Sequence, residues 1–363
     1  MKKINIPLSN NPYKVIIGSD ILESLGREIV SGKLPLNIFV VIDSNVRKYH
    51  FERIDSCLRS IASRLDYFVL PSGEKYKSSE TLARIYNKLI SSGFGRDSLM
   101  VAAGGGVTGD LTGFAAATFM RGIPYVQLPT TLLSAIDSSV GGKTGINFGK
   151  TKNVVGAFHQ PALVMSELAF LKTLPASEMF CGLGEVLKYA FLKDRTFFNT
   201  IDRKAAELLE GDLKTLEEIT AKCIQIKSSV VLCDEKEKGP RKILNLGHTF
   251  AHSYESLMNY SIKHGNAVLI GLACAVLLAE KYNLLSSADY LLFTGFLKKF
   301  NPGNSFKGLN REKLYNIMLR DKKNRNGRIK FVLPLTIGSA AIDFEAEKKD
   351  VIDVLYRVES FFS

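Results

Sequence analysis

Short apolar runs alternate with amphipathic stretches over the first half of the chain. Runs rich in β-branched and aromatic residues predict buried strands at 38–42, 67–70, 99–103 and 125–128. Strands that alternate with helical stretches indicate a parallel sheet covered by helices. After about residue 175 the pattern changes to long helical stretches rich in Ala, Leu, Glu and Lys. We therefore predict an α/β fold, with a Rossmann-like parallel-sheet domain at 1–175 and a mainly α-helical domain at 176–363.

A glycine-rich turn follows the third predicted strand. Residues 104–110 (GGGVTGD) lead into a helical pattern, so their backbone N–H groups can approach a pyrophosphate closely. The turn matches neither the G-x-G-x-x-G fingerprint nor a Walker A loop, and a simple tight turn is the alternative. Asp43 ends the strand at 38–42, where it can accept hydrogen bonds from ribose hydroxyls and favour NAD over NADP. Its alternative role is that of a helix N-cap.

Histidine is rare in this chain, and three of its five histidines lie in one short segment. If residues 245–255 are helical, Asn245, His248, His252 and Glu255 share one polar face. A solvated or buried structural histidine is the alternative. Two histidines and a carboxylate suit zinc with one open coordination position, but the spacing does not say which two histidines bind.

Several basic residues are candidates for an anion-binding site. Lys227 falls on the apolar stripe of residues 216–230, and a lysine that points inward requires an anionic partner. Lys188 lies three residues after Glu185 on a predicted helix, a spacing that by itself favours an exposed ion pair. The remaining candidates each resemble surface residues when taken singly: Lys143, Lys152, Arg241, Lys322 and Lys323.

The overall charge narrows the class of partner. With 48 Lys plus Arg against 36 Asp plus Glu, the net charge of +12 suits an anionic partner. The basic residues are scattered and no nucleic-acid-reading motif is present, so we expect a small phosphorylated substrate and no nucleic acid. The apolar run at 267–279 is too short to span a bilayer and predicts a buried helix.

Cysteine usage and the N-terminal segment bear on the compartment. The five cysteines form no C-x-x-C pair, which is typical of buried thiols in a reducing cytosol. No apolar stretch follows Lys2 and Lys3, as it would in a signal peptide. We expect a cytoplasmic protein that binds no membrane.

Six ordered segments together resemble the 3-dehydroquinate synthases of the sugar-phosphate cyclase family, and the resemblance runs along most of the chain. They are 104–110 (GGGVTGD), 137–147 (DSSVGGKTGIN), 149–158 (GKTKNVVGAF), 184–189 (GEVLKY), 244–255 (LNLGHTFAHSYE) and 264–272 (HGNAVLIGL). The chain departs from the usual pattern at Cys181, Ala251 and Asn266, none of which is an expected ligand.

The resemblance implies a role for each group of residues. Glu185, His248 and His264 would bind one divalent metal, zinc or cobalt. The NAD site would comprise Asp43, Asn45, Glu74, Lys77, Gly105, Gly106, Asp110, Thr130, Thr131, Lys143, Lys152, Thr173 and Leu174. Substrate would be bound by Arg121, Asp137, Asn153 and one of Lys322 and Lys323, with catalytic contributions from Lys143, Lys188, Lys227, Arg241, Asn245 and His252.

The implied reaction converts 3-deoxy-D-arabino-heptulosonate 7-phosphate to 3-dehydroquinate and phosphate, with NAD reduced and reoxidised in each cycle. A homodimer is expected on the same ground. Three other interpretations remain open. A metal-dependent polyol or glycerol dehydrogenase would release NADH and need fewer lysines. Another sugar-phosphate cyclase would act on a substrate without a carboxylate. A non-enzymatic nucleotide-binding module would leave the histidine cluster and the inward lysine unexplained.

Overall fold

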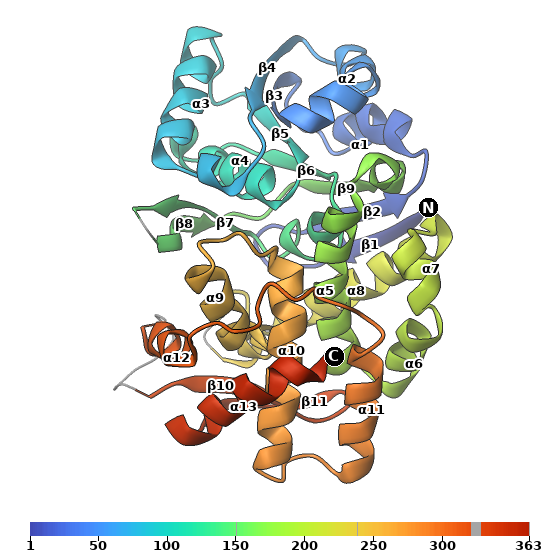
Figure 1. Cartoon of the computed structure of the whole chain (residues 1–363). Coiled ribbons are helices and arrows are strands. Elements are labelled where there is room, and N and C mark those ends of the chain that lie inside the picture. Colours follow the sequence, from blue (N-terminus) through green and yellow to red (C-terminus); the bar gives the residue numbers. More distant parts are fainter. Residues whose placement is uncertain (150, 238, 321–327, 363) are drawn as a thin grey trace. The chain divides into compact units, whose positions relative to one another are not determined.

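The computed structural model describes residues 1–149, 151–237, 239–320 and 328–362 (Figure 1). By their contacts these residues group into two compact units, Met1–Met179 with Gly211–Lys236, and Phe180–Glu210 with Glu237–Ser363. We call them the first and second unit. The segment 211–236 groups with the first unit, so the two units do not divide at a single point of the chain. The domain boundary expected at residues 175 and 176 remains a prediction.

A seven-stranded sheet forms the centre of the first unit, in the order β1-β2-β9-β6-β5-β3-β4. Every pairing is parallel except that of the edge strand β1. The predicted strands lie within β3 to β6, which confirms the parallel α/β fold. The strands are β1 (Lys2–Ile6), β2 (Tyr13–Gly18), β3 (Asn37–Asp43), β4 (Arg64–Leu70), β5 (Ser98–Gly104), β6 (Tyr125–Pro129) and β9 (Leu163–Glu167).

Helices cover both faces of this sheet, which explains why its strands are continuously apolar. Ile38, Val40 and Ile42 of β3 pack in one core with residues of α1 (Leu25–Ser31) and α2 (Ser44–Arg59). Phe39 and Val41 point to the other face. There they pack with residues of α3 (Ser79–Ser91) and α4 (Gly106–Thr118). The unit also contains α8 (Leu213–Cys233) and a separate hairpin of β7 (Lys143–Phe148) and β8 (Thr151–Phe158).

The second unit is mainly helical, as predicted. Its long helix α10 (His264–Lys281) is buried continuously from Ala267 to Ala279, which confirms the predicted buried helix. By length and composition this helix could cross a membrane, but 78% of the stretch is buried inside the structure. The other elements are most of α5 (Ala176–Leu192), α6 (Arg195–Arg203), α7 (Ala205–Glu210), α9 (His248–Leu257), α11 (Ser287–Leu297), α12 (Arg311–Leu319), α13 (Lys348–Phe361), and the hairpin of β10 (Lys330–Thr336) and β11 (Ser339–Glu345).

The cysteines are free thiols, as the absence of C-x-x-C pairs predicts. Cys181, Cys223 and Cys274 are buried and Cys57 is half-buried. Cys233, at the end of α8, is exposed, so the prediction of a buried thiol is wrong there.

A single buried carboxylate organises the backbone where β9 ends. Glu167 is 1% exposed, and its two oxygens accept hydrogen bonds from the backbone N–H groups of Asp20, Ile21, Leu22 and Ala169, at 2.7 to 2.9 Å. A buried charge is tolerated when hydrogen bonds satisfy its oxygens. Glu167 therefore joins the turn after β2 to the segment after β9.

We expect Glu167→Gln to destabilise the protein, because the amide turns an N–H donor toward backbone donors. The free energy of unfolding should fall by about 2–3 kcal/mol, the range for a hydrogen bond to a charged group. Denaturant unfolding followed by circular dichroism measures the change. Glu52→Gln is the matched control, since Glu52 is exposed on α2. Equal stability of the two variants would contradict the assigned role of Glu167.

Candidate functional site

Most of the residues predicted to bind a nucleotide follow the carboxyl ends of parallel strands in the first unit. Asp43 ends β3, Glu74 and Lys77 follow β4, Gly105 follows β5, Thr130 follows β6, and Thr173 lies in the short helix after β9. These strands are neighbours in the order β9-β6-β5-β3-β4. Their carboxyl ends therefore meet at one edge of the sheet, where open α/β sheets bind ligands.

The glycine turn allows close packing at the start of α4. Gly105 caps this helix, and a Cβ at Gly104 would lie 2.4 Å from the Thr108 hydroxyl oxygen. A Cβ at Gly105 would lie 3.1 Å from the side chain of Thr131. The backbone N–H of Thr130 donates to the Gly104 carbonyl at 3.0 Å, which joins the ends of β5 and β6. The turn thus brings a helix N-terminus to the ends of β5 and β6 with no side chains of its own at residues 104–106, an arrangement suited to a phosphate.

Asp43 has the structural role considered for it, and its role toward ribose stays a prediction. Its carboxylate caps α2 by accepting the Asn45 N–H at 2.7 Å, so the N-cap alternative is correct as a structural role. The Ser72 hydroxyl donates to the same carboxylate at 2.8 Å, and the Asn45 side chain donates to Ser72, also at 2.8 Å. Asp43 and Asn45 are thereby held side by side at the end of β3.

A polar network connects four of the predicted residues. The Lys77 ammonium, 4% exposed, donates to the carboxylate of Asp110 and to the Asn153 side-chain oxygen, both at 2.5 Å. The network continues through Asn147, which donates to Glu74 at 2.8 Å and accepts the Asn153 backbone N–H at 2.9 Å. Sequence reasoning did not single out Asn147, whose only signal was its place at the end of the segment 137–147.

Lys227 points inward on α8, as its place on the apolar stripe predicted. Its ammonium donates to the backbone carbonyl of Asp137 at 2.7 Å and lies 3.0 Å from the Asp137 carboxylate. The chain itself therefore supplies an anionic partner. Two residues predicted to act on substrate are brought together by this pair.

Other predicted residues of the first unit are more open to solvent. Lys143, at the start of β7, is exposed, and Lys152 on β8 is half-buried. Arg121 is exposed, and the described residues give it no hydrogen bond or ion pair. The Thr173 hydroxyl pairs with the ring of His50 at 2.7 Å, and Leu174 follows it.

Three side chains of the second unit form a group that could hold a metal ion. Glu185 of α5, His248 of α9 and His264 of α10 each offer one ligand atom, and these atoms all lie within 4.8 Å of one another. The Glu185 oxygen Oε1 is 3.2 Å from His248 Nε2 and 3.0 Å from His264 Nε2. Its other oxygen forms an ion pair with Lys188, so the predicted exposed pair is in fact buried. One carboxylate and two imidazoles match the ligands that zinc prefers.

The neighbours of the two histidines orient their rings. His248 Nδ1 lies 3.1 Å from the Leu246 carbonyl, which can only accept, so Nδ1 carries the proton and Nε2 is left to bind a metal. Burial lowers the pKa of His248 to about 4, which keeps its ring neutral. His264 Nδ1 faces the Glu255 carboxylate at 3.5 Å. Although burial opposes it, Glu185 and Glu255 raise the pKa of His264 well above its usual value.

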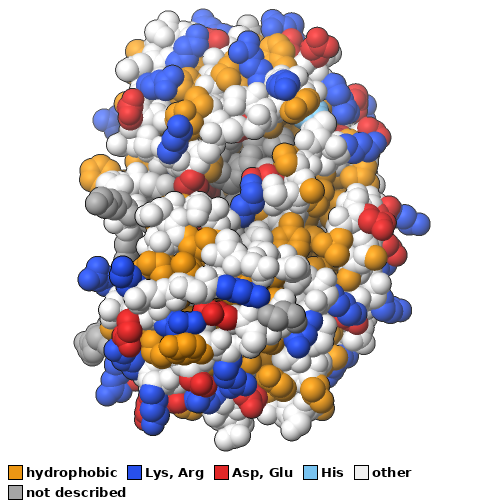
Figure 2. Space-filling view, viewed as in Figure 1, with side chains coloured by type: hydrophobic (Ala, Val, Ile, Leu, Met, Phe, Trp, Pro, Cys, Tyr) orange, Lys and Arg blue, Asp and Glu red, His pale blue; other side chains and the backbone are white. Residues whose placement is uncertain are grey.

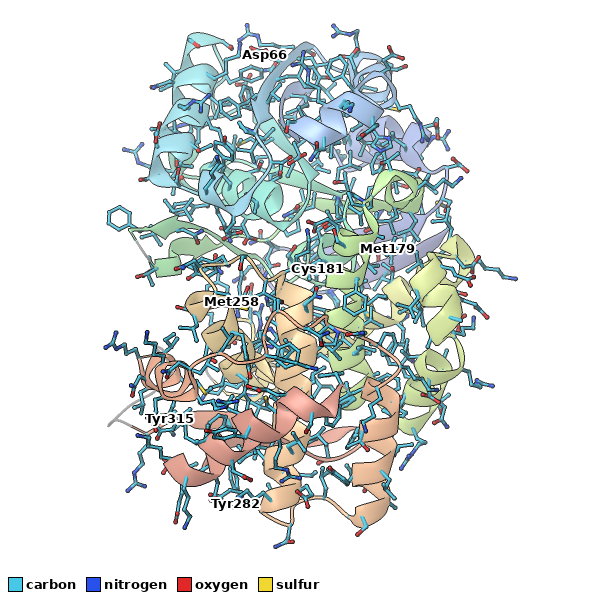
Figure 3. All side chains as sticks on the ribbon, viewed as in Figure 1. Asp66, Met179, Cys181, Met258, Tyr282 and Tyr315 are labelled. Carbon is cyan, nitrogen blue, oxygen red and sulfur yellow. The ribbon has the colours of Figure 1, made fainter. Side chains whose placement is uncertain are left out.

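Glycine contacts bring the three ligand residues together. A Cβ at Gly184 would lie 2.3 Å from the Gly265 carbonyl oxygen, and one at Gly265 only 1.8 Å from that of Cys181, labelled in Figure 3. On the other side of α10, a Cβ at Gly271 would lie 2.2 Å from the carbonyl oxygen of Gly247. Gly184, Gly247 and Gly265 are chain neighbours of Glu185, His248 and His264. Backbone contact without side chains is therefore what sets the ligand spacing.

The polar helical face predicted for residues 245–255 is correct only in part. Gly247 adopts φ +76°, so α9 begins at His248, and Asn245 lies in a preceding 3-10 helix, donating to Glu237 at 3.1 Å. The ring of His252 lies 5.5 Å from that of His248. Glu255, predicted on the same face as His252, faces His264. Arg241 is 1% exposed. Lys322 and Lys323 lie outside the described residues.

Several solved structures share the fold of this chain. The solved structure of 2-deoxy-scyllo-inosose synthase, complexed with carbaglucose-6-phosphate, NAD+ and Co2+, is similar with a TM-score of 0.89 at 24% identity, over 98% of this chain and 100% of that one. ValA, the 2-epi-5-epi-valiolone synthase of Streptomyces hygroscopicus with NAD+ and Zn2+ bound, gives 0.86 at 26% identity, over 97% and 98%. Glycerol dehydrogenase from Schizosaccharomyces pombe shares the fold with a TM-score of 0.67 at 16% identity, over 96% and 89%.

Relatives identified by sequence show the family more specifically than the solved structures do. The chain is 39% identical to the 3-dehydroquinate synthase of Pelobacter propionicus over 94% of this chain and 96% of that protein. It is 38% identical to that of Desulforamulus reducens, over 98% and 99%. The family models for the N-terminal and C-terminal parts of 3-dehydroquinate synthase match residues 67–181 and 182–324. The chain belongs to the 3-dehydroquinate synthase family.

Proposed function

We propose that this protein is a 3-dehydroquinate synthase, a carbon–oxygen lyase of the shikimate pathway. It converts 3-deoxy-D-arabino-heptulosonate 7-phosphate to 3-dehydroquinate and phosphate by transient oxidation, phosphate elimination, reduction and intramolecular aldol closure. The observation that carries the proposal is the Glu185, His248 and His264 group in a chain 38–39% identical to 3-dehydroquinate synthases along almost its whole length. Its substrate is a small molecule.

Glu185, His248 and His264 hold one divalent ion, zinc or cobalt, in this proposal. The donor set supports it, because two imidazole nitrogens and one carboxylate leave a coordination position open for substrate oxygen. When bound, the ion supplies Lewis-acid polarisation of substrate hydroxyls. Lys188 and Glu255 orient two of the three ligands, since one pairs with Glu185 and the other faces His264.

NAD is the second cofactor, held in the first unit at the strand ends around Asp43, Lys77 and the glycine turn. The start of α4 supports this assignment, because the glycines at 104–106 leave the helix N-terminus without side chains of its own, so its backbone N–H groups can approach a phosphate closely. When bound, NAD would supply reversible hydride transfer to and from the substrate. The Asp43 carboxylate, fixed by Asn45 and Ser72, accepts from ribose hydroxyls.

The substrate is doubly anionic, and the proposed binding groups are cations and hydrogen-bond donors. Lys143, Lys188, Lys227, Arg241 and Arg121 neutralise its carboxylate and phosphate, while Asp137, Asn153 and Asn245 bind its hydroxyls. His252 relays the proton of the hydroxyl that is oxidised. Buried ion pairs hold Lys188 and Lys227 in fixed positions, so little reorganisation accompanies charge development in the reaction.

We also propose a cytoplasmic homodimer. Exposed apolar side chains gather on the β7–β8 hairpin, where Phe148, Val154 and Phe158 are 60%, 43% and 46% exposed. Among the described strands β8 pairs only with β7, so its other edge can add a strand of a second copy. Acidic and basic side chains are interspersed on the face seen in Figure 2, in agreement with a small-molecule partner.

The first experiment measures phosphate release from 3-deoxy-D-arabino-heptulosonate 7-phosphate with substoichiometric NAD and zinc, while absorbance of NADH is followed in parallel. We expect many turnovers of phosphate for each NAD and no accumulation of NADH, because the hydride returns to the substrate. Absence of phosphate release, with NADH formed from glycerol-like polyols, would assign the chain to the dehydrogenases instead.

Lys227→Met should reduce kcat/KM for the sugar phosphate by about 100-fold or more, since a charge-stabilising donor contributes on the order of 3 kcal/mol in a closed site. The dissociation constant of NAD should change little. Lys222→Met, on the same helix, is the control and should leave kcat/KM unchanged. Steady-state kinetics give kcat/KM, and titration gives the dissociation constant of NAD. If catalytic efficiency and NAD affinity fell by the same factor, a role toward substrate would be contradicted.

Gly265→Ala should weaken metal binding, because its Cβ would strike the Cys181 carbonyl and separate His264 from Glu185. Disturbing the support of a metal ligand typically costs about 10- to 100-fold in affinity. Competition with a chromophoric chelator measures this affinity for zinc. Gly295→Ala is the control, since a Cβ there meets nothing within 4 Å. Unchanged zinc affinity in a folded Gly265→Ala protein would show that the contact does not set the ligand spacing.

A further inference from the structure

Asn147 lies at an irregularity in the β7–β8 hairpin. Ile146 pairs with Val155 and Phe148 with Thr151, so three residues of β8 oppose Asn147 alone. Its backbone N–H turns away from the hairpin and donates to the Lys77 carbonyl at 2.8 Å. Such a bulge leaves backbone groups unpaired and re-aims side chains. The side chain of Asn147 is half-buried and faces two polar neighbours.

The two ends of the Asn147 amide make different hydrogen bonds. Its nitrogen donates to Glu74 Oε1 at 2.8 Å, and its oxygen accepts the backbone N–H of Asn153 at 2.9 Å. Asn153 has φ +50°, a left-handed conformation that is uncommon for residues other than glycine and that asparagine adopts more readily than most. The hydrogen bond that its backbone N–H donates to Asn147 holds it in this conformation.

These bonds decide which groups of Glu74 and Asn153 remain available. The Lys77 ammonium can only donate, so it takes the Asn153 side-chain oxygen and directs the NH2 group of that amide elsewhere. Asn147 occupies one oxygen of Glu74. Within the described ranges, no residue bonds the other Glu74 oxygen or the Asn153 NH2 group. Asn147 thus fixes the Glu74 acceptor through the Glu74 side chain and the Asn153 donor through the Asn153 backbone, while Lys77 sets the direction of the Asn153 amide.

We propose that Asn147 is a positioning residue that orients Glu74 toward the nucleotide and Asn153 toward the sugar-phosphate substrate. The proposal rests on the function proposed above, which assigns Glu74 to NAD and Asn153 to substrate. Asn147 itself touches neither ligand. It acts through its two hydrogen bonds, and each can be broken separately because each uses a different end of the amide.

Asn147→Asp removes only the bond to Glu74. The new side chain keeps an oxygen for the Asn153 N–H but presents a carboxylate to the carboxylate of Glu74. We expect the dissociation constant of NAD to rise about 10-fold, the effect of losing a hydrogen bond to a charged group. The KM for the sugar phosphate should change less than about threefold, since the Asn153 bond persists. Asn147→Ala removes both bonds and should raise both constants.

Restoring the bond with reversed polarity provides a rescue test. In the double variant Glu74→Gln/Asn147→Asp the new amide can donate to the new carboxylate. We expect NAD to bind at least several-fold more tightly to the double variant than to Asn147→Asp alone. If the two residues acted independently, the losses of NAD affinity in the two single variants would multiply in the double variant, which a double-mutant cycle detects. That result would overturn the proposal.

Asn37→Asp is the matched control. Asn37 begins β3, at the opposite end of that strand from Asp43, and donates to the Asp97 carboxylate at 2.6 Å. The substitution makes the same chemical change without touching the strand ends, and NAD affinity should stay at the wild-type value. Equal weakening of NAD binding by Asn37→Asp and Asn147→Asp would reduce Asn147 to a structural role and overturn the proposal.

The two proposals fail in distinguishable ways. NAD binding is titrated with the full chain in the absence of substrate, so this arm does not depend on turnover. If wild-type protein binds NAD but releases no phosphate, the proposed function fails while the Asn147 and Glu74 coupling is still measured. If wild-type protein turns over normally and Asn147→Asp binds NAD as tightly as wild type, the role of Asn147 fails alone.

Discussion

Contact between glycine backbones at two points of α10 is the constraint on which the candidate metal-binding group depends. Gly184 and Gly265 allow α5 to touch the start of α10, and Gly247 and Gly271 allow the turn before α9 to touch its middle. Side chains at these positions would separate Glu185, His248 and His264 by the width of a methyl group or more. Packed interiors do not absorb such a displacement, so the chemistry of this unit depends on residues that have no side chain.

Three buried lysines each pair with a carboxylate. Lys77, Lys188 and Lys227 are 4%, 2% and 7% exposed, and each pairs with a carboxylate, Asp110, Glu185 and Asp137 respectively. An isolated buried ammonium would lose its proton or destabilise the fold, whereas a paired one keeps its charge. These pairs fix cations in position before an anionic ligand arrives. The net positive charge of the chain therefore matters less than where three of its lysines are held.

The sheet arranges the predicted nucleotide-binding residues in a different way. Parallel strands end at one edge, so residues separated by more than a hundred positions, such as Asp43 and Thr173, follow strand ends on the same edge of the sheet. Polar side chains there make local bonds: Asp43 caps α2, and Asn147 joins Glu74 to Asn153. A few side-chain hydrogen bonds thus fix the polar groups at the strand ends of a common α/β fold.

The sequence by itself determined the parallel sheet, the helical second half, the inward direction of Lys227 and the candidate ligands, because hydrophobic periodicity and rare residue types are local signals. Sequence-based prediction was wrong where one backbone angle, or a residue distant along the chain, sets the position of a side chain. Gly247 breaks the helical face and removes Asn245 from it, and Glu255 faces His264 of the next helix. Asn147 meets Asn153 because the β7–β8 hairpin is irregular there, and it meets Glu74 in the segment after β4. Only the tertiary structure decided these pairings, since they join segments whose spacing along the chain carries no record of contact.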